Sequence, residues 1–438
     1  MKNSQFLLLF IFLALHSFQT QAQTWEKTIK APDGDEIFDF TMTNDDQIAL
    51  FINNRDFLAS PSNGIITLVL LEKDGTIKKQ KTLKAKHFDP NIDSAIADLH
   101  MGSVIFHQNN YLATAAIKID TPNTFVEVFF KLDTNFNIIQ SKFHDTTTTG
   151  IKTYVRIKEI KNRIFAIGLF LEPDWKLIFT EITDSLFKKN PALLFNTQDT
   201  LKIQNTFDFL RDTDENLYLF GKEKFIADLE MIKLDSNYRL IKKQAVTHPV
   251  LPHDVYVLVS GRMNAFWSKD STIIMTLLGP TDNGKGDLHF YELDKNFNQL
   301  NYQRNVTIDT SEFNFNQETA VFDSLCNCYY QGVTKRLDGW NSSLLGGRDT
   351  TDFQLFRFDK DLNIKFNRYY RPNKFFIFMA LDTDSEGNVI MVGQTQDIIP
   401  ADPFDTDIFV LKVDSLGNIN SPVGLEESDT EINRLNFQ

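Results

Sequence analysis

The sequence predicts an all-β chain that folds as a seven-bladed β-propeller with four antiparallel strands in each blade. Two turn phrases each recur seven times in step with one another, and no convincing amphipathic helix interrupts them. Their mean period, about 57 residues, is in the range of propeller blades and is too long for the usual helical repeats. We expect the propeller to occupy residues 23–422.

The first phrase is an alternating apolar run, a polar turn and a second apolar run. Its clearest copy runs from Phe129 to Ile139, where the turn reads Asp-Thr-Asn-Phe-Asn. Asn, Asp and Gly favour such turns because they tolerate positive φ and cap the bend with side-chain hydrogen bonds. We mark each copy by the residue that takes the place of Asp133. These markers are Glu72, Asp133, Thr183, Asp235, Asp294, Asp359 and Asp414, and successive markers are 61, 50, 52, 59, 65 and 55 residues apart.

The second phrase precedes each marker and consists of polar turn residues followed by an apolar run. It is clearest from Asp212 to Gly221 and from Asp382 to Gly393. A further apolar run stands before each of these turns, as in Ile37-Phe38-Asp39-Phe40. The alternation and the aromatic content favour strands. A complete unit therefore contains four strands, with tight turns after the first and third strands and variable loops elsewhere.

The ring has a predicted closure. The segment Trp25 to Ile29 precedes the first unit but is typical of a fourth strand, and the last unit lacks a strong strand after Asn418. We therefore expect the N-terminal strand to complete blade seven and to close the ring. The remaining residues, 423–438, lack the repeat, and we expect a loosely ordered tail.

The first residues are typical of a signal peptide. Lys2 provides a positive charge, residues 6–15 are apolar, and Ala22 supplies a small residue for cleavage. We expect residues 1–22 to be removed, which indicates a secreted, periplasmic or cell-surface protein. No later apolar stretch is long enough to span a membrane, which requires about 20 residues.

The composition excludes several classes of protein. Asp and Glu number 58 against 45 Lys and Arg, a net charge of −13, and this acidity disfavours nucleic acids and anionic membranes as partners. Two cysteines cannot build a disulfide scaffold, whereas 40 Phe residues can supply a large apolar core. We expect a monomer.

The predicted topology places all the variable loops on one face of the ring. Long loops on a rigid scaffold commonly carry binding sites, although they can also be neutral insertions. The longest predicted loops are residues 53–64, 247–262, 279–286, 334–352 and 395–407.

The candidate ligand-binding residues lie in two of these loops. Blade six combines a Trp with Arg and Asp side chains, and blade three presents a second Trp. A Trp beside carboxylates and Arg can stack on a sugar ring and bond its hydroxyls; alternatively, either Trp packs against its own blade. The candidates are Trp340, Arg336, Asp338, Arg348, Asp349 and Trp175.

No motif in the sequence predicts a catalytic residue, a metal site or a cofactor. Cys326 and Cys328 could form a disulfide, remain thiols or bind a metal ion, and no His lies close in sequence. The Asp-rich segments at Asp212 and Asp382 are similar to calcium loops but run directly into strands, so we interpret them as hairpin turns. No nucleophile elbow or phosphate loop is present in the sequence.

The repeats resemble those of secreted propeller-like proteins of Bacteroidota. The resemblance is carried by Lys233 to Asn237, by Leu411 to Ile419 and by Asp382 to Gly393. Many such proteins end in a type IX secretion sorting domain, and Ser421 to Glu427 looks like the linker that leads into one, with the domain itself expected to be absent. The resemblance implies a fold and export, and it implies little about activity.

The sequence favours a secreted, non-catalytic propeller that binds a glycan or a protein partner through its loop face. The alternative is a propeller hydrolase or lyase that acts on polysaccharide with carboxylates around the central channel. A cluster of carboxylates with perturbed pKa values in the channel would favour the alternative. The fold alone does not decide between these two functions.

Overall fold

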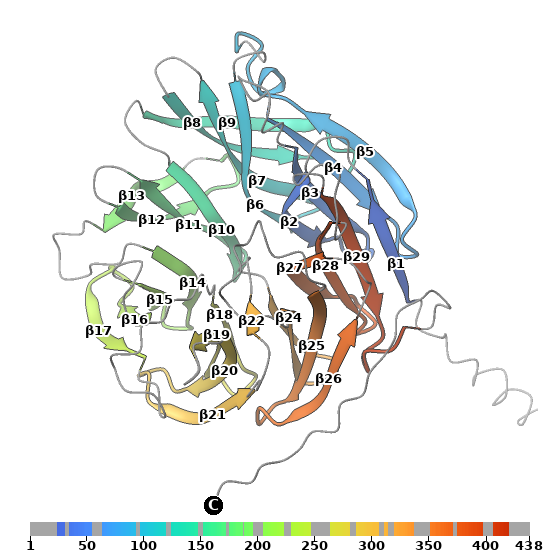
Figure 1. The fold of residues 1–438 in the computed structure, drawn as a ribbon. Coiled ribbons are helices and arrows are strands. Elements are labelled where there is room, and N and C mark those ends of the chain that lie inside the picture. The colour runs from blue at the N-terminus through green and yellow to red at the C-terminus, as the bar shows by residue number, and fades with distance from the viewer. Residues whose placement is uncertain are drawn as a thin grey trace, which may run out of the picture.

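Seven small antiparallel sheets are arranged around a central axis, as Figure 1 shows. The predicted seven-bladed β-propeller is confirmed. The computed structural model describes residues 24–30, 35–54, 64–92, 97–119, 124–147, 152–171, 175–186, 188–195, 205–222, 229–246, 263–280, 286–305, 311–313, 319–336, 351–370, 375–396 and 406–419.

The first four blades each contain four consecutive strands, with the first strand innermost and the fourth at the periphery. Blade one contains β2 (Asp35–Met42), β3 (Ile48–Asn54), β4 (Ile65–Leu71) and β5 (Ile77–Leu83). Blade two contains β6 (Ala97–His107), β7 (Asn110–Ile119), β8 (Thr124–Leu132) and β9 (Ile138–Thr147). Blade three contains β10 (Lys152–Ile160), β11 (Arg163–Leu171), β12 (Trp175–Ile182) and β13 (Lys188–Phe195). Blade four contains β14 (Asn205–Arg211), β15 (Leu217–Lys222), β16 (Leu229–Leu234) and β17 (Leu240–Ala245).

The other three blades include two departures from this simple order. Blade five contains β18 (Asn264–Trp267), β19 (Ile273–Pro280), β20 (Gly286–Leu293) and β21 (Gln299–Asn305). Blade six has its inner strand in two pieces, which both pair with its second strand: β22 (Ser311–Phe313), β23 (Ala320–Asp323), β24 (Cys328–Arg336), β25 (Thr351–Asp359) and β26 (Ile364–Tyr370). Blade seven contains β27 (Phe375–Thr383), β28 (Val389–Gln396), β29 (Asp407–Val413) and, from the other end of the chain, β1 (Trp25–Ile29).

The burial of each strand follows from its place in the blade. A middle strand packs against neighbouring blades on both sides, so β4 is almost entirely apolar and buried. The peripheral strand β5 reads Ile-Lys-Lys-Gln-Lys-Thr-Leu and is largely exposed. One short 3₁₀ segment, Ala85–His87, is the helical element among the described residues.

Aromatic side chains fill the spaces between neighbouring blades. Between blades one and two, the rings of Phe51 and Tyr111 meet edge to face at 5.9 Å between centroids. Between blades six and seven, Phe353 lies 4.9 Å from Phe376 in the same geometry. These arrangements add roughly 0.5–1.5 kcal/mol per pair to the burial itself. Buried Phe residues of the described part of the chain therefore contribute to a series of inter-blade cores.

Six of the seven predicted markers begin a turn that is closed by the same backbone bond; at Thr183 the closing residue lies outside the described part of the chain. At Asp133, the backbone N–H bonds to the Asn137 carbonyl, and Oδ1 accepts the N–H groups of Asn135 and Asn137. The fourth residue, Phe136, has a φ of +60° and is fully buried. Its left-handed conformation costs roughly 1–2 kcal/mol, which the burial of a Phe ring, about 1.5–3 kcal/mol, offsets. The same N–H-to-carbonyl bond closes the turns at Glu72, Asp235, Asp294, Asp359 and Asp414.

Strand β1 closes the ring as predicted. It pairs antiparallel with β29, with Trp25 opposite Lys412. Gly75 takes the buried turn position in blade one with a φ of +82°, and a Cβ there would lie 2.7 Å from the Trp25 ring. The absence of a side chain at Gly75 therefore makes room for the indole, whose N–H donates to the Lys73 carbonyl at 2.9 Å.

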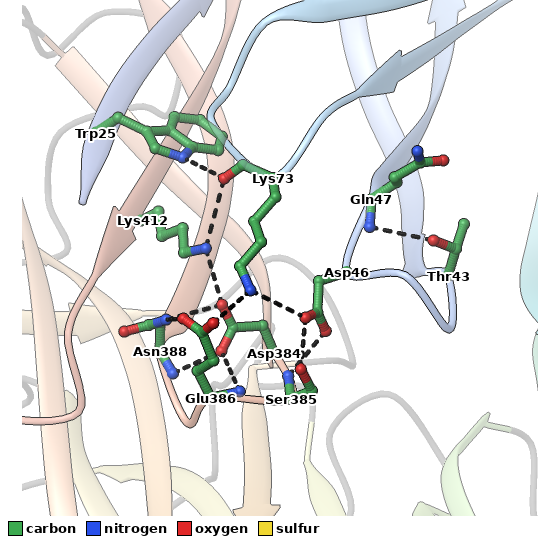
Figure 2. A network of polar contacts seen from close by, with 10 residues as sticks. All are labelled: Trp25, Thr43, Asp46, Gln47, Lys73, Asp384, Ser385, Glu386, Asn388 and Lys412. Atoms are coloured by element: carbon green, nitrogen blue, oxygen red, sulfur yellow. Dashed lines mark hydrogen bonds and ion pairs between the residues drawn. The ribbon is translucent and has the colours of Figure 1, made fainter. Parts of the chain in front are cut away.

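Polar contacts fasten the same junction between blades one and seven (Figure 2). The Lys73 ammonium lies between the carboxylates of Asp46, at 3.5 Å, and Glu386, at 2.6 Å. The hydroxyl and the backbone N–H of Ser385 both bond to Asp46. Burial raises the pKa of Asp46, but these two bonds and the charge of Lys73 outweigh it, so the pKa lies below its usual value. Beneath them, Lys412 and Asp384 form a buried ion pair at 2.8 Å.

The terminal segments are outside the described residues, so the predicted signal peptide (1–22) and tail (423–438) stay predictions. The inner part of the predicted domain, from Thr24 to Ile419, contains all seven blades. No helix within the described part of the chain is long and apolar enough to cross a membrane.

Replacing Trp25 by Ala is expected to destabilise the fold by roughly 3–5 kcal/mol, the usual cost of truncating a buried Trp. The loss follows from the cavity against Gly75 and from the lost bond to Lys73. Urea denaturation of residues 23–438 measures it. Leu416→Ala, at a side chain that is 54% exposed, serves as the control. An unchanged midpoint for Trp25→Ala would contradict a closing role for β1.

Acid is expected to weaken the turns. Burial raises the pKa of Asp359, but the Lys365 ammonium and the Asn363 amide and N–H lower it by more, to about 2. An unfolded Asp titrates near pH 3.9, so the stability from this carboxylate is complete above that pH and is lost as the pH falls towards 2. Denaturation midpoints at pH 7, 4 and 2 should therefore fall less steeply in Asp359→Asn than in the wild type. Equal slopes would count against this account.

Candidate functional site

The ring has two chemically different faces. The short turns after the first and third strands of each blade lie at one end of the sheets, which we call the short-turn face. Antiparallel pairing places the other connections at the opposite end, the long-connection face. The strand ends that open there include Asn54 and Ile65, Arg336 and Thr351, and Gln396 and Asp407. The predicted one-sided placement is therefore confirmed for the strand ends, and the loops themselves lie outside the described residues.

The structure places two of the six candidate ligand residues. Arg336 is the last residue of β24, where it pairs with Ser311 and Thr351. Trp175 is the first residue of β12 and pairs with Leu171. Both therefore lie at the long-connection face, but on blades six and three, which are not neighbours in the ring. Their side chains are outside the description, as are Asp338, Trp340, Arg348 and Asp349.

Polar side chains lie beside the blade-six end of this face. The ammonium of Lys335, next to Arg336, donates to the Tyr369 hydroxyl at 2.9 Å and lies 4.4 Å from the centre of its ring. The buried Gln354 amide donates to the same hydroxyl at 3.0 Å. These contacts hold a cationic side chain at the strand end from which the predicted binding loop departs.

A second polar cluster lies at the corresponding end of blade five. Asp287, fully buried on β20, pairs with Arg304 at 2.7 Å. Two residues further on, Nδ1 of the buried His289 lies 2.9 Å from the Tyr302 hydroxyl, and their rings stack. Burial raises the pKa of Tyr302 to about 12, with Arg304 opposing and Asp287 adding to the rise. The phenol is therefore neutral at physiological pH and can serve as a hydrogen-bond donor.

The innermost strands carry a belt of polar residues at their β-bulges. In blade one, Asp39 accepts the backbone N–H of Val104 in blade two at 2.8 Å. In blade two, the Ser103 hydroxyl accepts the N–H of Ile157 in blade three at 3.1 Å. Asp208, at the bulge of blade four, likewise accepts the N–H of Ala265 in blade five. Two further polar links between blades do not involve a bulge: Asn264 bonds with Thr319, and Thr334 on β24 accepts the N–H of Phe378 in blade seven.

The blade three to blade four link is ionic. Arg156 takes the bulge position in β10 and, as a guanidinium, cannot accept an N–H. It instead contacts Asp208 Oδ2 at 3.2 Å, while Lys158 contacts Oδ1 at 2.5 Å. The carboxylate also accepts the N–H groups of Phe209 and Ala265. Asp208 is thus fully buried and has two cations and two N–H donors around it, which suits a structural anion better than a proton-transfer group.

The sequence carries a local signal for this belt. A single polar residue interrupts the first apolar run of a blade, as in Phe38-Asp39-Phe40 and Phe207-Asp208-Phe209. A carboxylate flanked by Phe in a buried strand requires a partner, because an unpaired buried charge is costly. The interruption therefore indicated an inter-blade bond, although it did not indicate which residue would make it.

The segment with the two cysteines and the Asp-rich segments all form turns. Cys326 and Cys328 are joined in a disulfide, one of the alternatives left open by the sequence. Together with Asp323 they form the one group of potential metal ligands found among the described residues, and it lies on the short-turn face. The segments at Asp212 and Asp384 are hairpin turns, as predicted, because each carboxylate caps N–H groups of its own turn.

Comparison with known proteins bears on the fold and goes no further. No protein-family model and no curated protein matches the chain. Among solved structures, the chain is similar to the WD40 domain of Toxoplasma gondii coronin, at 10% identity and a TM-score of 0.45 over 90% of this chain and 87% of the other. It is also similar to the phage phi92 endosialidase, at 8% identity and a TM-score of 0.47 over 93% and 71% of the two chains. A third similar structure is Chaetomium thermophilum Sqt1 bound to the N-terminus of ribosomal protein L10. It has 8% identity and a TM-score of 0.46 over 88% of this chain and 98% of the other.

These similarities carry no argument about activity, because the identities are low and the TM-scores are below 0.5. The assignment of the propeller rests on the pairing of the strands in this chain. The named relatives include a hydrolase and a partner-binding protein, and neither activity transfers to this chain.

Removing the Asp208 carboxylate is expected to cost roughly 3–5 kcal/mol of stability, since Asp208→Ala leaves Arg156 and Lys158 near each other without their anion. Urea denaturation followed by Trp fluorescence measures the loss. Asp361→Ala removes a carboxylate whose side chain is 59% exposed and should change the midpoint little. Equal effects of the two substitutions would contradict the proposed importance of the belt.

Proposed function

We propose that this chain is a secreted, non-catalytic propeller that binds a glycan or a protein partner through its long-connection face. The observation that carries the proposal is the structural difference between the two faces of the ring. The short-turn face consists of hairpins in which Asp carboxylates cap the N–H groups of their own turns, and some of these turns also bond to one another. The long-connection face is where the strand ends open into connections whose lengths differ from blade to blade along the sequence.

The blade-six end of that face has suitable chemistry for a polar ligand. Lys335 is half-buried and held against Tyr369, so its charge is positioned beside the loop that contains Asp338, Trp340, Arg348 and Asp349. A fixed cation, an aromatic ring and carboxylates can together bond hydroxyl groups and stack on a sugar or an aromatic side chain. Trp175 on blade three is a second candidate anchor at the same face.

The described carboxylates of the inner strands give less support to the alternative, a polysaccharide hydrolase or lyase. Asp39 accepts two backbone N–H groups and the Ser103 hydroxyl. Asp208 is held by two cations and two N–H groups. A catalytic acid or nucleophile must instead reach the substrate, so these two residues are assigned to the structure of the ring.

The test is retention of residues 23–438 on a panel of immobilised polysaccharides, together with an assay for released products. Trp340→Ala is expected to weaken retention by roughly tenfold or more if Trp340 is a binding hot spot. Leu416→Ala, exposed on the short-turn face, is the control and should bind like the wild type. Product release would overturn the non-catalytic proposal.

A protein partner requires a second arm of the same experiment. If no polysaccharide is retained, immobilised wild-type chain and Trp340→Ala are compared for capture of secreted proteins from the native source. A protein that is retained by the wild type and by Leu416→Ala, and lost with Trp340→Ala, supports binding at the long-connection face. Equal capture by all three chains would contradict it.

A further inference from the structure

The first turn of blade six departs from a construction that five other Asp turns share. In the turn at Asp133, Oδ1 accepts two backbone N–H groups and Oδ2 accepts the Asn137 side-chain amide. The turns at Asp212, Asp294, Asp384 and Asp414 repeat this scheme with an Asn four residues later. Both oxygens of each carboxylate therefore have N–H donors.

In blade six, the corresponding carboxylate is only half satisfied. Oδ1 of Asp323 accepts the Leu325 N–H at 2.8 Å. Oδ2 lies 3.3 Å from Cys326 Sγ, and this sulfur has no proton to donate because it is bonded to Cys328. No ion pair or N–H donor reaches Oδ2 within the described part of the chain. Asp323 is 3% exposed, so this oxygen is a buried anionic acceptor that requires a cation or a donor.

The hairpin brings two further ligand atoms to the same place. Cys328 begins β24 directly opposite Asp323, and Cys326 lies in the turn between them. The carboxylate oxygen and the two sulfur atoms all lie within 4.8 Å of one another. The backbone of Gly387 in blade seven approaches the carboxylate so closely that a Cβ there would lie 3.2 Å from Oδ2. Cys328 is buried, whereas Cys326 is half-buried and so is partly in contact with solvent.

We propose that this turn, when its disulfide is reduced, binds one thiophilic divalent cation of the Zn²⁺ class through Asp323, Cys326 and Cys328. Thiolates and a carboxylate are preferred ligands of such an ion, and three protein ligands leave one tetrahedral position for water. The inference does not depend on the proposed ligand-binding function, because the turn lies on the opposite face of the ring.

Reduction of the disulfide by a phosphine makes the site available to the cation. The phosphine breaks the S–S bond, takes an oxygen atom from water to become its oxide, and leaves two thiols. Binding of the cation then displaces the two thiol protons and forms two sulfur–metal bonds and one oxygen–metal bond. When the two thiols are oxidised to the disulfide again, two of the three ligands are lost. The redox state of the two cysteines therefore decides whether the metal site exists.

The test is a titration of reduced, desalted residues 23–438 with Cd²⁺ and Zn²⁺ under anaerobic conditions, followed by thiolate-to-Cd²⁺ charge-transfer absorption and by competition with a chelator. One ion per chain is expected for the reduced protein and none for the oxidised protein. Asp323→Asn should bind at least about tenfold more weakly, since even partners next to the ligands are worth roughly 10–100-fold. Cys326→Ser should lose most of the absorption.

The chain supplies a matched control. Asp414-Ser415-Leu416 repeats the Asp323-Ser324-Leu325 triplet in a turn without sulfur, so Asp414→Asn should bind the ion like the wild type. Denaturation midpoints of the variants establish that each is folded. The proposal is overturned if the reduced protein binds less than one ion, if the oxidised protein binds equally well, or if folded Asp323→Asn retains the wild-type affinity.

Discussion

The junctions after blades one, two and four depend on one recurring bond, in which a polar side chain at an inner-strand bulge accepts a backbone N–H of the next blade. The innermost strand of each blade pairs with only one neighbouring strand, so some of its backbone N–H groups have no partner within their own sheet. Asp39 and Ser103 meet this need for the following blades, and Asp208 does so for blade five. Where Arg156 replaces the acceptor, Asp208 supplies the opposite charge. The blades are thereby held in register around the axis by polar contacts as well as by apolar packing between their faces.

The short-turn face shows how the sequence can repeat while individual positions vary. An apolar residue such as Phe136 or Leu362 accepts an unfavourable backbone conformation in order to cover the core beneath its turn. Gly75 and Gly417 leave that place to rings from neighbouring strands, namely Trp25 for the first and Phe366 and Tyr370 for the second. The polar groups and apolar side chains of the short-turn face are consequently used in the structure of the turns. The connections of variable length leave from the opposite face.

The parts of the fold that could be predicted are those whose chemistry is local. A turn such as Asp133 to Asn137 forms all of its bonds within five residues, so its sequence alone indicates the hairpin. The closing strand at Trp25 was also predictable, because it supplied the strand that the last unit lacked. The bonds between blades were not, since the partner of Asp39 lies at Val104 and depends on how two blades pack. Likewise, the contact of Asp323 with Cys326 requires the hairpin register. Trp340 and its neighbours remain candidates on chemical grounds alone.

The pairing of β1 with β29 sets the order in which the molecule can be completed. Trp25 is among the first described residues to be synthesised and Lys412 among the last, yet they are partners in one sheet. Closing so long a loop is entropically costly, and contacts of this kind slow folding. During synthesis β1 has no edge to join, so the seventh blade stays unfinished until β29 has been made. The ring therefore cannot lock before that strand is available, whatever the order in which the other blades form.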